Sequence, residues 1–195
     1  MNYLGHAFLS FGNDAILTGN MLGDHVKGKL ALDNYPEQIK KGLILHRKID
    51  GFADIHSAHL QAKLLFKGVY GLYSSPIVDT LFDHYIACDH KLFPTESSLY
   101  LFSQTVYSIL EKNEDVFPQQ FASMFNHMRQ NNWLYNYRNF AGIRQSLNGL
   151  ARRAKYLPPI DKAYEIFITN YYQINQYYFD FMADMIKFSR NEIVK

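Results

Sequence analysis

The chain has 195 residues, the size of one domain, and 48% of them are hydrophobic, which is enough to form a core. Aromatic residues make up 16% of the chain, which excludes an intrinsically disordered protein. Twenty basic and eighteen acidic residues leave a net charge of +2, so the overall charge does not favour a nucleic-acid partner. The single cysteine, Cys88, excludes an intramolecular disulfide and cysteine-based zinc motifs.

The N-terminal segment, residues 1–6, lacks the basic start and the small-residue cleavage site of a signal peptide. No stretch approaches the roughly eighteen uncharged apolar residues that a membrane-spanning helix needs. We therefore expect a soluble, cytoplasmic protein that forms one domain over residues 1–195 and has neither a membrane nor a nucleic acid as a partner. The sequence does not indicate an oligomeric state.

Apolar residues recur at helical spacing along almost the whole chain. The predicted helices, in chain order, cover residues 14–27, 36–53, 57–70, 74–88, 95–109, 118–130, 137–153 and 161–190. Pro36 and Pro76 stand at the start of two of them, where the first turn of a helix tolerates proline. No segment alternates apolar and polar residues in the manner of a β-strand. The pattern predicts an all-α, single-domain helical bundle.

Two of these helices carry ionisable residues on the face that should turn towards the core. His46 and Asp50 lie on the inner face of the helix that starts at Pro36. His84 lies on the inner face of the helix over 74–88, with Asp83 beside it. Burying an unpaired charge costs several kcal/mol, so these residues need partners. Because adjacent helix residues point about 100° apart, Asp83 and His84 would contact one ion only if this face borders a crevice.

Two more polar residues, His6 and Asp24, interrupt apolar segments near the N-terminus. Helical bundles commonly bind metal ions through His and acidic side chains on facing helices. Imidazole and carboxylate ligands suit Mn²⁺, Fe²⁺ or Zn²⁺, whereas a structural zinc site usually contains thiolates. The concurrence of three imidazoles and at least two carboxylates favours one metal site over five unrelated exceptions.

Each residue also has a simpler interpretation. A buried His or Asp commonly satisfies a backbone group or caps a helix. Asp50 and Arg47 could form an ion pair on one helix. The other histidines with no inward pattern are expected to be exposed to solvent; they are His56, His59, His90 and His127.

Six short segments resemble the acyl carrier protein phosphodiesterases in their order and spacing, from residue 1 to about residue 190. They cover residues 1–6 (MNYLGH), 19–24 (GNMLGD), 46–50 (HRKID), 82–85 (FDHY), 133–138 (WLYNYR) and 147–153 (LNGLARR). Each segment alone is unspecific, whereas all of them in this order are fairly specific. The resemblance implies an HD-domain-like fold and a divergent member of the HD-type metal phosphohydrolases. That class is named for adjacent His and Asp, whereas here Asp83 precedes His84.

The resemblance further implies a phosphodiesterase that hydrolyses the bond between 4′-phosphopantetheine and a serine of holo-acyl carrier protein. The implied cofactor is Mn²⁺, with Mg²⁺, Fe²⁺ and Zn²⁺ as alternatives. On this hypothesis the metal ligands are His6, Asp24, His46, Asp83 and His84. The catalytic residues are Asp24, His46, Asp50, Asp83 and His84, with Asp50 either orienting an imidazole or acting as a further ligand.

Four arginines are candidates for substrate binding: Arg47, Arg138, Arg152 and Arg153. A planar guanidinium donates two hydrogen bonds at once to a phosphate. A local basic patch would also suit an acidic carrier protein. Arg152 and Arg153 could equally form a solvated helix end that interacts favourably with the helix dipole.

Three other functions stay open. An HD-type phosphohydrolase of nucleotides or other small phosphate esters would share the metal site but would not need surface arginines for a protein partner. A non-catalytic, carrier-binding helical module would tolerate changes at His46 and Asp83. An oxygen-using di-iron bundle is least favoured, because it expects Glu-x-x-His repeats on paired helices, and the sequence has none at suitable positions.

Overall fold

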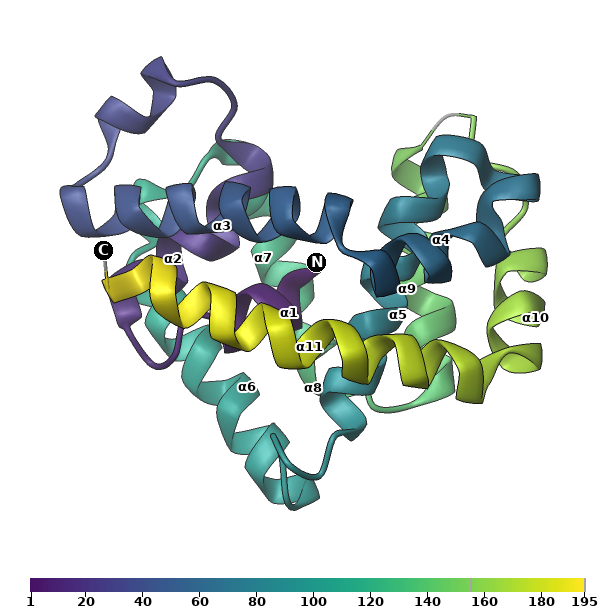
Figure 1. Ribbon diagram of the computed structural model, residues 1–195. Coiled ribbons are helices and arrows are strands. Elements are labelled where there is room, and N and C mark those ends of the chain that lie inside the picture. The colour runs from purple at the N-terminus through teal and green to yellow at the C-terminus, as the bar shows by residue number, and fades with distance from the viewer. Residues whose placement is uncertain (155, 195) are drawn as a thin grey trace.

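A computed structural model describes residues 1–154 and 156–194, and every regular element within these ranges is a helix (Figure 1). The α-helices are α1 (Tyr3–Phe8), α2 (Asp14–Leu22), α3 (Glu37–Ile55), α4 (Ser57–Tyr70), α5 (Ser74–Cys88), α6 (Glu96–Glu111), α7 (Gln119–Gln130), α8 (Trp133–Asn136), α9 (Phe140–Arg153), α10 (Asp161–Thr169) and α11 (Tyr171–Val194). Short 3₁₀ helices are η1 (Gly23–His25), η2 (Leu30–Asn34), η3 (Gly71–Tyr73) and η4 (Glu114–Val116). The predicted all-α class is confirmed. None of the described helices is both long and apolar enough to cross a membrane.

Three predicted helices differ from the observed ones, and asparagine accounts for two of the differences. The helix expected over 161–190 is divided at Asn170, whose side chain donates to the Ile166 carbonyl at 2.8 Å. The helix expected over 137–153 begins only after Asn139, whose side-chain oxygen caps it by accepting from Gly142 N at 2.7 Å. Such local side-chain hydrogen bonds compete with a continuous helix. The helix expected over 14–27 ends at Leu22 and continues as η1.

Glycine allows α2 and α3 to pack with their backbones almost in contact. A Cβ atom on Gly19 would lie 2.0 Å from the carbonyl oxygen of Ile39, and one on Gly42 would lie 2.2 Å from that of Ile16. Real Cβ atoms do not approach backbone this closely, so larger residues at either position would separate the two helices. This close approach places the end of α2 beside the middle of α3.

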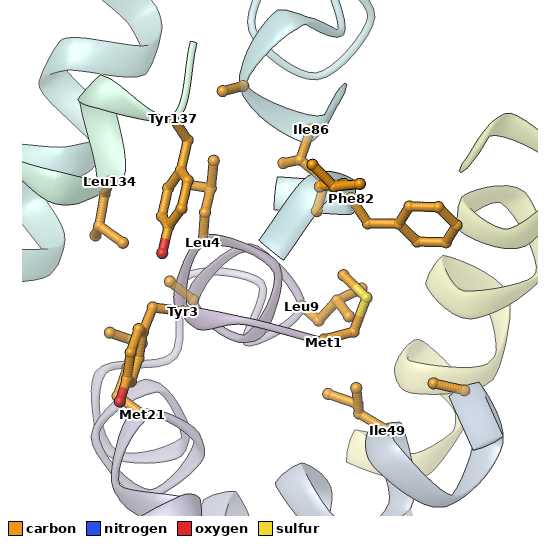
Figure 2. Close-up of a cluster of buried hydrophobic side chains, with 14 of the residues drawn as sticks. Met1, Tyr3, Leu4, Leu9, Met21, Ile49, Phe82, Ile86, Leu134 and Tyr137 are labelled. Atoms are coloured by element: carbon orange, nitrogen blue, oxygen red, sulfur yellow. The ribbon is translucent and has the colours of Figure 1, made fainter. Parts of the chain in front are cut away.

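The short helix α1 packs against α2 and α5, and the long α11 runs along α3, α4 and α5 (Figure 1). Leu4 of α1 is fully buried. Around α1, Tyr3 and Tyr137 stand on one side, whereas Met1 and Phe82 stand on the other (Figure 2). The buried apolar residues form one continuous core around these helices. Because α1 is held in this core, its polar residues are fixed against their neighbours.

Candidate metal centre

Four of the predicted site residues lie together where α1, η1 and α3 meet. Asp50 links the two histidines: its Oδ2 is 3.1 Å from His46 Nε2 and its Oδ1 is 3.3 Å from His6 Nε2. Asp24 approaches from η1, with its Oδ1 3.4 Å from His46 Nε2. We refer to His6, Asp24, His46 and Asp50 as the His/Asp cluster. Within the described part of the chain, the metal-ligating side chains whose donor atoms all lie within 4.8 Å of one another are His6, His46 and Asp50.

Asn20, on α2, orients both imidazole rings. Its Nδ2 donates a hydrogen bond to the His6 carbonyl oxygen at 2.8 Å, so its Oδ1 is the atom that faces the His6 ring. This oxygen accepts a hydrogen bond from His6 Nδ1, also at 2.8 Å. The backbone carbonyl of Asn20 accepts from His46 Nδ1 at 2.8 Å. In its neutral form each ring therefore carries its proton on Nδ1 and leaves the Nε2 lone pair available to a cation, the arrangement that second-sphere partners give to metal-binding histidines. The His6 and His46 rings are stacked, with their centroids 4.0 Å apart.

The close approach of η1 to α3 depends on Gly23. A Cβ atom at this position would lie 2.1 Å from the His46 ring, so any larger residue would displace the imidazole. Asp24 follows Gly23 directly, and its position next to His46 therefore depends on the same contact.

The cluster fits a divalent cation by its own chemistry. His6 Nε2 is buried and makes no hydrogen bond within the described residues, although a carboxylate oxygen lies 3.3 Å away. A buried nitrogen without a partner is costly unless something binds it. Two imidazole nitrogens and oxygens from two carboxylates form a donor set that suits Mn²⁺, Fe²⁺ or Zn²⁺.

The charges of the cluster are strongly coupled. Partial desolvation by the neighbouring residues would raise the pKa of Asp24, but the hydrogen bond and the positive charge of His46 hold this pKa at about 2. The two histidines likewise hold the pKa of Asp50 far below its usual range, against the effect of burial. Burial would lower the pKa of His46, but its hydrogen bonds to the two carboxylates raise it to about 9. A bound cation would replace the proton on His46 and compensate both carboxylates.

This coupling predicts how the stability of the metal-free protein depends on pH. The pKa of His46 is raised by folding to about 9, so its stabilisation is complete below its unfolded pKa of about 6.5 and is lost as the pH rises through 9. We expect the stability difference between the native chain and His46→Gln to shrink by about 3 kcal/mol from about pH 6 to about pH 10. Denaturant unfolding in the presence of a chelator measures this difference. A difference that does not change with pH would contradict the raised pKa.

The structure does not bring Asp83 and His84 into the cluster, contrary to the expectation that all five residues contact one ion. Asp83 is buried and accepts from the backbone N–H groups of Leu4 at 2.7 Å and Gly5 at 3.0 Å, so it caps the start of α1. Burial raises the pKa of Asp83 to about 7 despite these two donors. His84 points elsewhere, because adjacent residues on a helix diverge by about 100°.

His84 contacts the backbone and aromatic rings on a different side of α5. Its Nδ1 lies 2.7 Å from the carbonyl oxygen of Tyr137, and its Nε2 lies 3.0 Å from the Tyr171 hydroxyl. Its ring stacks on Phe140, with the centroids 5.5 Å apart. These contacts occupy both ring nitrogens, so His84 has the role of a satisfied buried histidine.

Three of the four candidate arginines make polar contacts within the protein: Arg47, Arg138 and Arg153, whose Nη1 lies 3.9 Å from Met124 Sδ. Arg47 donates to the carbonyl oxygens of Val26 at 3.0 Å and Gly28 at 2.8 Å, and so fixes the segment that follows η1. Arg138 forms an ion pair with Glu96 at 2.6 Å. Neither the Arg47 nor the Arg138 guanidinium contacts the His/Asp cluster in the structure.

Arg152 and Arg153, at the end of α9, line a cavity of about 730 Å³. Both residues are exposed to solvent. The wall of the cavity also includes His25, which follows Asp24 in the chain. These two arginines are thus the candidates that a substrate in this cavity would meet.

Sequence reasoning missed three groups near the cluster: His59, the amino group of Met1 and Asn20. His59, expected to be solvated, is fully buried, and its Nε2 lies 2.9 Å from Asp79 Oδ1. The same carboxylate oxygen lies 3.1 Å from the amino group of Met1, which is also 3.3 Å from Asp50 Oδ1. The apolar spacing around His59 did not predict its burial. Its partner, Asp79, lies on a different helix, so the contact between α4 and α5 could not be seen in either segment alone. The third residue, Asn20, is a neutral amide within an apolar segment.

The fold and the cluster define the class of protein: an all-helical chain in which His and Asp side chains converge on one point and form a donor set that could hold a metal ion. More specifically, the chain belongs to the acyl carrier protein phosphodiesterase family, whose model matches residues 1–185.

Proteins named acyl carrier protein phosphodiesterase are similar to the chain over nearly its whole length. The protein from Photorhabdus laumondii is 30% identical over 184 residues, which cover 94% of this chain and 88% of that protein. Those from Pectobacterium atrosepticum and Enterobacter sp. are 24% and 26% identical over 192 residues, covering 98% of this chain and 99% of each relative. No solved structure matches the chain, so the relation to HD-type enzymes stays a prediction.

Proposed function

We propose that residues 1–195 act as one domain that hydrolyses the phosphodiester between 4′-phosphopantetheine and the serine of holo-acyl carrier protein. Membership of the acyl carrier protein phosphodiesterase family supports this substrate. The observation that carries the mechanism is the pair of Nε2 atoms of His6 and His46, both fixed by Asn20 and both directed at Asp50.

The cluster residues His6, His46, Asp50 and Asp24 would hold a divalent cation, and Mn²⁺ is the one we propose. When bound, such a cation lowers the pKa of a water molecule and withdraws charge from the phosphoryl oxygens. The chain itself supplies access on the side of Asp24, whose side chain is 61% exposed, whereas the side chain of His6 is only 2% exposed. A phosphodiester would therefore approach the cluster past Asp24.

Asp83 and His84 have a positioning role in this proposal. Asp83 holds the first turn of α1 through two backbone N–H groups, and α1 carries His6. His84 holds the backbone carbonyl of Tyr137, a residue in the wall of the cavity beside the cluster. Both residues would affect turnover through the groups that they place, without contact with the substrate.

Intact mass spectrometry of a holo-acyl carrier protein after incubation with this protein tests the proposal. We expect the carrier to lose its entire phosphopantetheine arm in the presence of Mn²⁺ and to stay unchanged when a chelator is added. Loss of the arm in both conditions would contradict the metal dependence. An unchanged carrier in both conditions, together with turnover of nucleotides or small phosphodiesters, would favour a small-molecule phosphohydrolase instead.

A further inference from the structure

The cavity of about 730 Å³ lies between α1, α7, α8 and α9 and is large enough for a small organic ligand. Tyr3 and Tyr137 border it from the core side. Both rings stand on the same side of α1 (Figure 2). Gln145, Gly149 and Arg153 line it from α9.

One end of this cavity adjoins the His/Asp cluster. The hydroxyl of Tyr3, in the cavity wall, lies 3.4 Å from Nε2 of His25, and His25 directly follows Asp24. The same hydroxyl lies 3.2 Å from Met124 Sδ, and Arg153 Nη1 lies 3.9 Å from that sulfur atom. Arg153 is therefore close to the end of the cavity at which His25 and Asp24 lie. A phosphoryl group near Asp24 would have Arg153 within reach on the cavity side.

The remainder of the lining is rich in amides. Side-chain amides come from α7, α8 and α9, from the turn between α7 and α8, and from the segment before α1; they belong to Asn2, Gln120, Asn131, Asn136 and Gln145. Gln120 and Gln145 are exposed, so their donors and acceptors are available to a ligand. Among the described residues, no acidic one lines the cavity, whereas Arg152 and Arg153 do. The walls thus suit a neutral chain with its own amide groups, attached to an anion.

We propose that this cavity binds the pantetheine part of the carrier's prosthetic group, a flexible chain with two amides, with its phosphate directed towards Arg153 and the His/Asp cluster. This inference rests on the proposed function and adds the place at which the arm is recognised. Amide side chains would exchange hydrogen bonds with the amides of the arm, as pockets do when a few polar groups fix the orientation of a ligand. The arm would extend away from the cluster along α9, past Gly149.

Gly149 permits a direct test, because it lines the cavity and an added Cβ atom would meet nothing within 4 Å. Gly149→Phe would introduce a bulky ring into the lining at a position where the protein has room for its Cβ atom. Gly68→Phe is the matched control: Gly68 is also helical, an added Cβ there also meets nothing within 4 Å, and it is not part of the lining. Neither change disfavours a helix, since glycine is itself a poor helix former.

Calorimetric titration with free pantetheine, which lacks the phosphate, measures the cavity independently of turnover. We expect saturable binding to the native chain and to Gly68→Phe, and binding at least about tenfold weaker to Gly149→Phe. In the carrier assay, Gly149→Phe should raise KM for holo-carrier to a similar extent. The inhibition constant of apo-carrier, which has no arm, should stay within about twofold in all three proteins.

Absence of pantetheine binding to the native chain, or equal binding to Gly149→Phe, would overturn the inference even if the native chain releases the arm. Conversely, a native chain that binds pantetheine at this cavity but leaves holo-carrier intact would retain the site and refute the proposed function. If both variants unfold at the same melting temperature as the native chain, neither result stems from misfolding.

Discussion

Asp50→Asn is expected to lower kcat for release of the arm from holo-carrier by at least about a hundredfold, and added Mn²⁺ should not restore it. Asp50 is the residue that contacts both imidazoles of the cluster. Loss of even an outer-sphere partner of a metal ligand typically costs about 10–100-fold, and Asp50 stands within the donor set itself. An amide keeps the shape of the carboxylate but removes the charge that compensates the cation. Steady-state kinetics over a range of Mn²⁺ concentrations measure the effect.

Asp54→Asn is the matched control for this change. Asp54 lies one turn further along α3, its side chain is 65% exposed, and it forms a long ion pair of 3.8 Å with Lys63. We expect its activity to stay within about twofold of the native chain, because exposed ion pairs contribute little. If Asp50→Asn retained the activity of the control, Asp50 would have no part in the site and the cluster would not be the metal centre.

The sequence predicted most of the fold, because the helices have regular apolar spacing. The starts of α3, α5 and α6 follow recognisable signals, such as the capping box at Thr95 that opens α6. The breaks before α9 and α11 were not predicted, since Asn139 caps the start of α9 and Asn170 ends α10 through hydrogen bonds that leave the apolar spacing unchanged. The six-residue α1 was also missed, as it is too short to show a period.

The sequence also indicated the core of the candidate site, for a related reason. His6, His46 and Asp50 stand out as polar residues on apolar faces, and the structure places them together. Asp83 and His84 gave the same signal but serve other purposes, because a buried polar residue can satisfy backbone groups as readily as it binds a ligand. Spacing along one helix cannot distinguish these two uses, as the partner comes from a different part of the chain.

Asn20 illustrates the opposite failure, since its role depends on contacts that no sequence pattern reveals. The side chain lies at the end of α2, is fully buried, and uses Oδ1 for His6 Nδ1 and Nδ2 for both the His6 carbonyl and Ser10 Oγ. Its carbonyl oxygen meets His46 only because Gly19 and Gly42 let the helices touch. A single residue thereby sets the orientation of both imidazoles that the cation would need.

Asn20→Leu is expected to lower the affinity for Mn²⁺ by about 10–100-fold while leaving kcat near the native value at saturating Mn²⁺. Leucine has a similar volume but cannot accept from His6 Nδ1, so the ring would lose its fixed tautomer and orientation. The variant should also be less stable by about 1–3 kcal/mol, because buried groups on His6 and Ser10 lose their partner. Metal titration of the folded protein, followed by the same kinetic assay, separates affinity from turnover.

Thr18→Val controls for the loss of a buried polar group on the same helix. Thr18 is fully buried in α2, and its hydroxyl donates to the Asp14 carbonyl at 2.9 Å, away from the cluster. Its Mn²⁺ affinity should equal that of the native chain. Equal affinities in Asn20→Leu and Thr18→Val would mean that the histidines keep their orientation without Asn20. We expect excess Mn²⁺ to restore the activity of Asn20→Leu but not that of Asp50→Asn. This difference would distinguish the residue that orients the metal ligands from the residue that binds the cation.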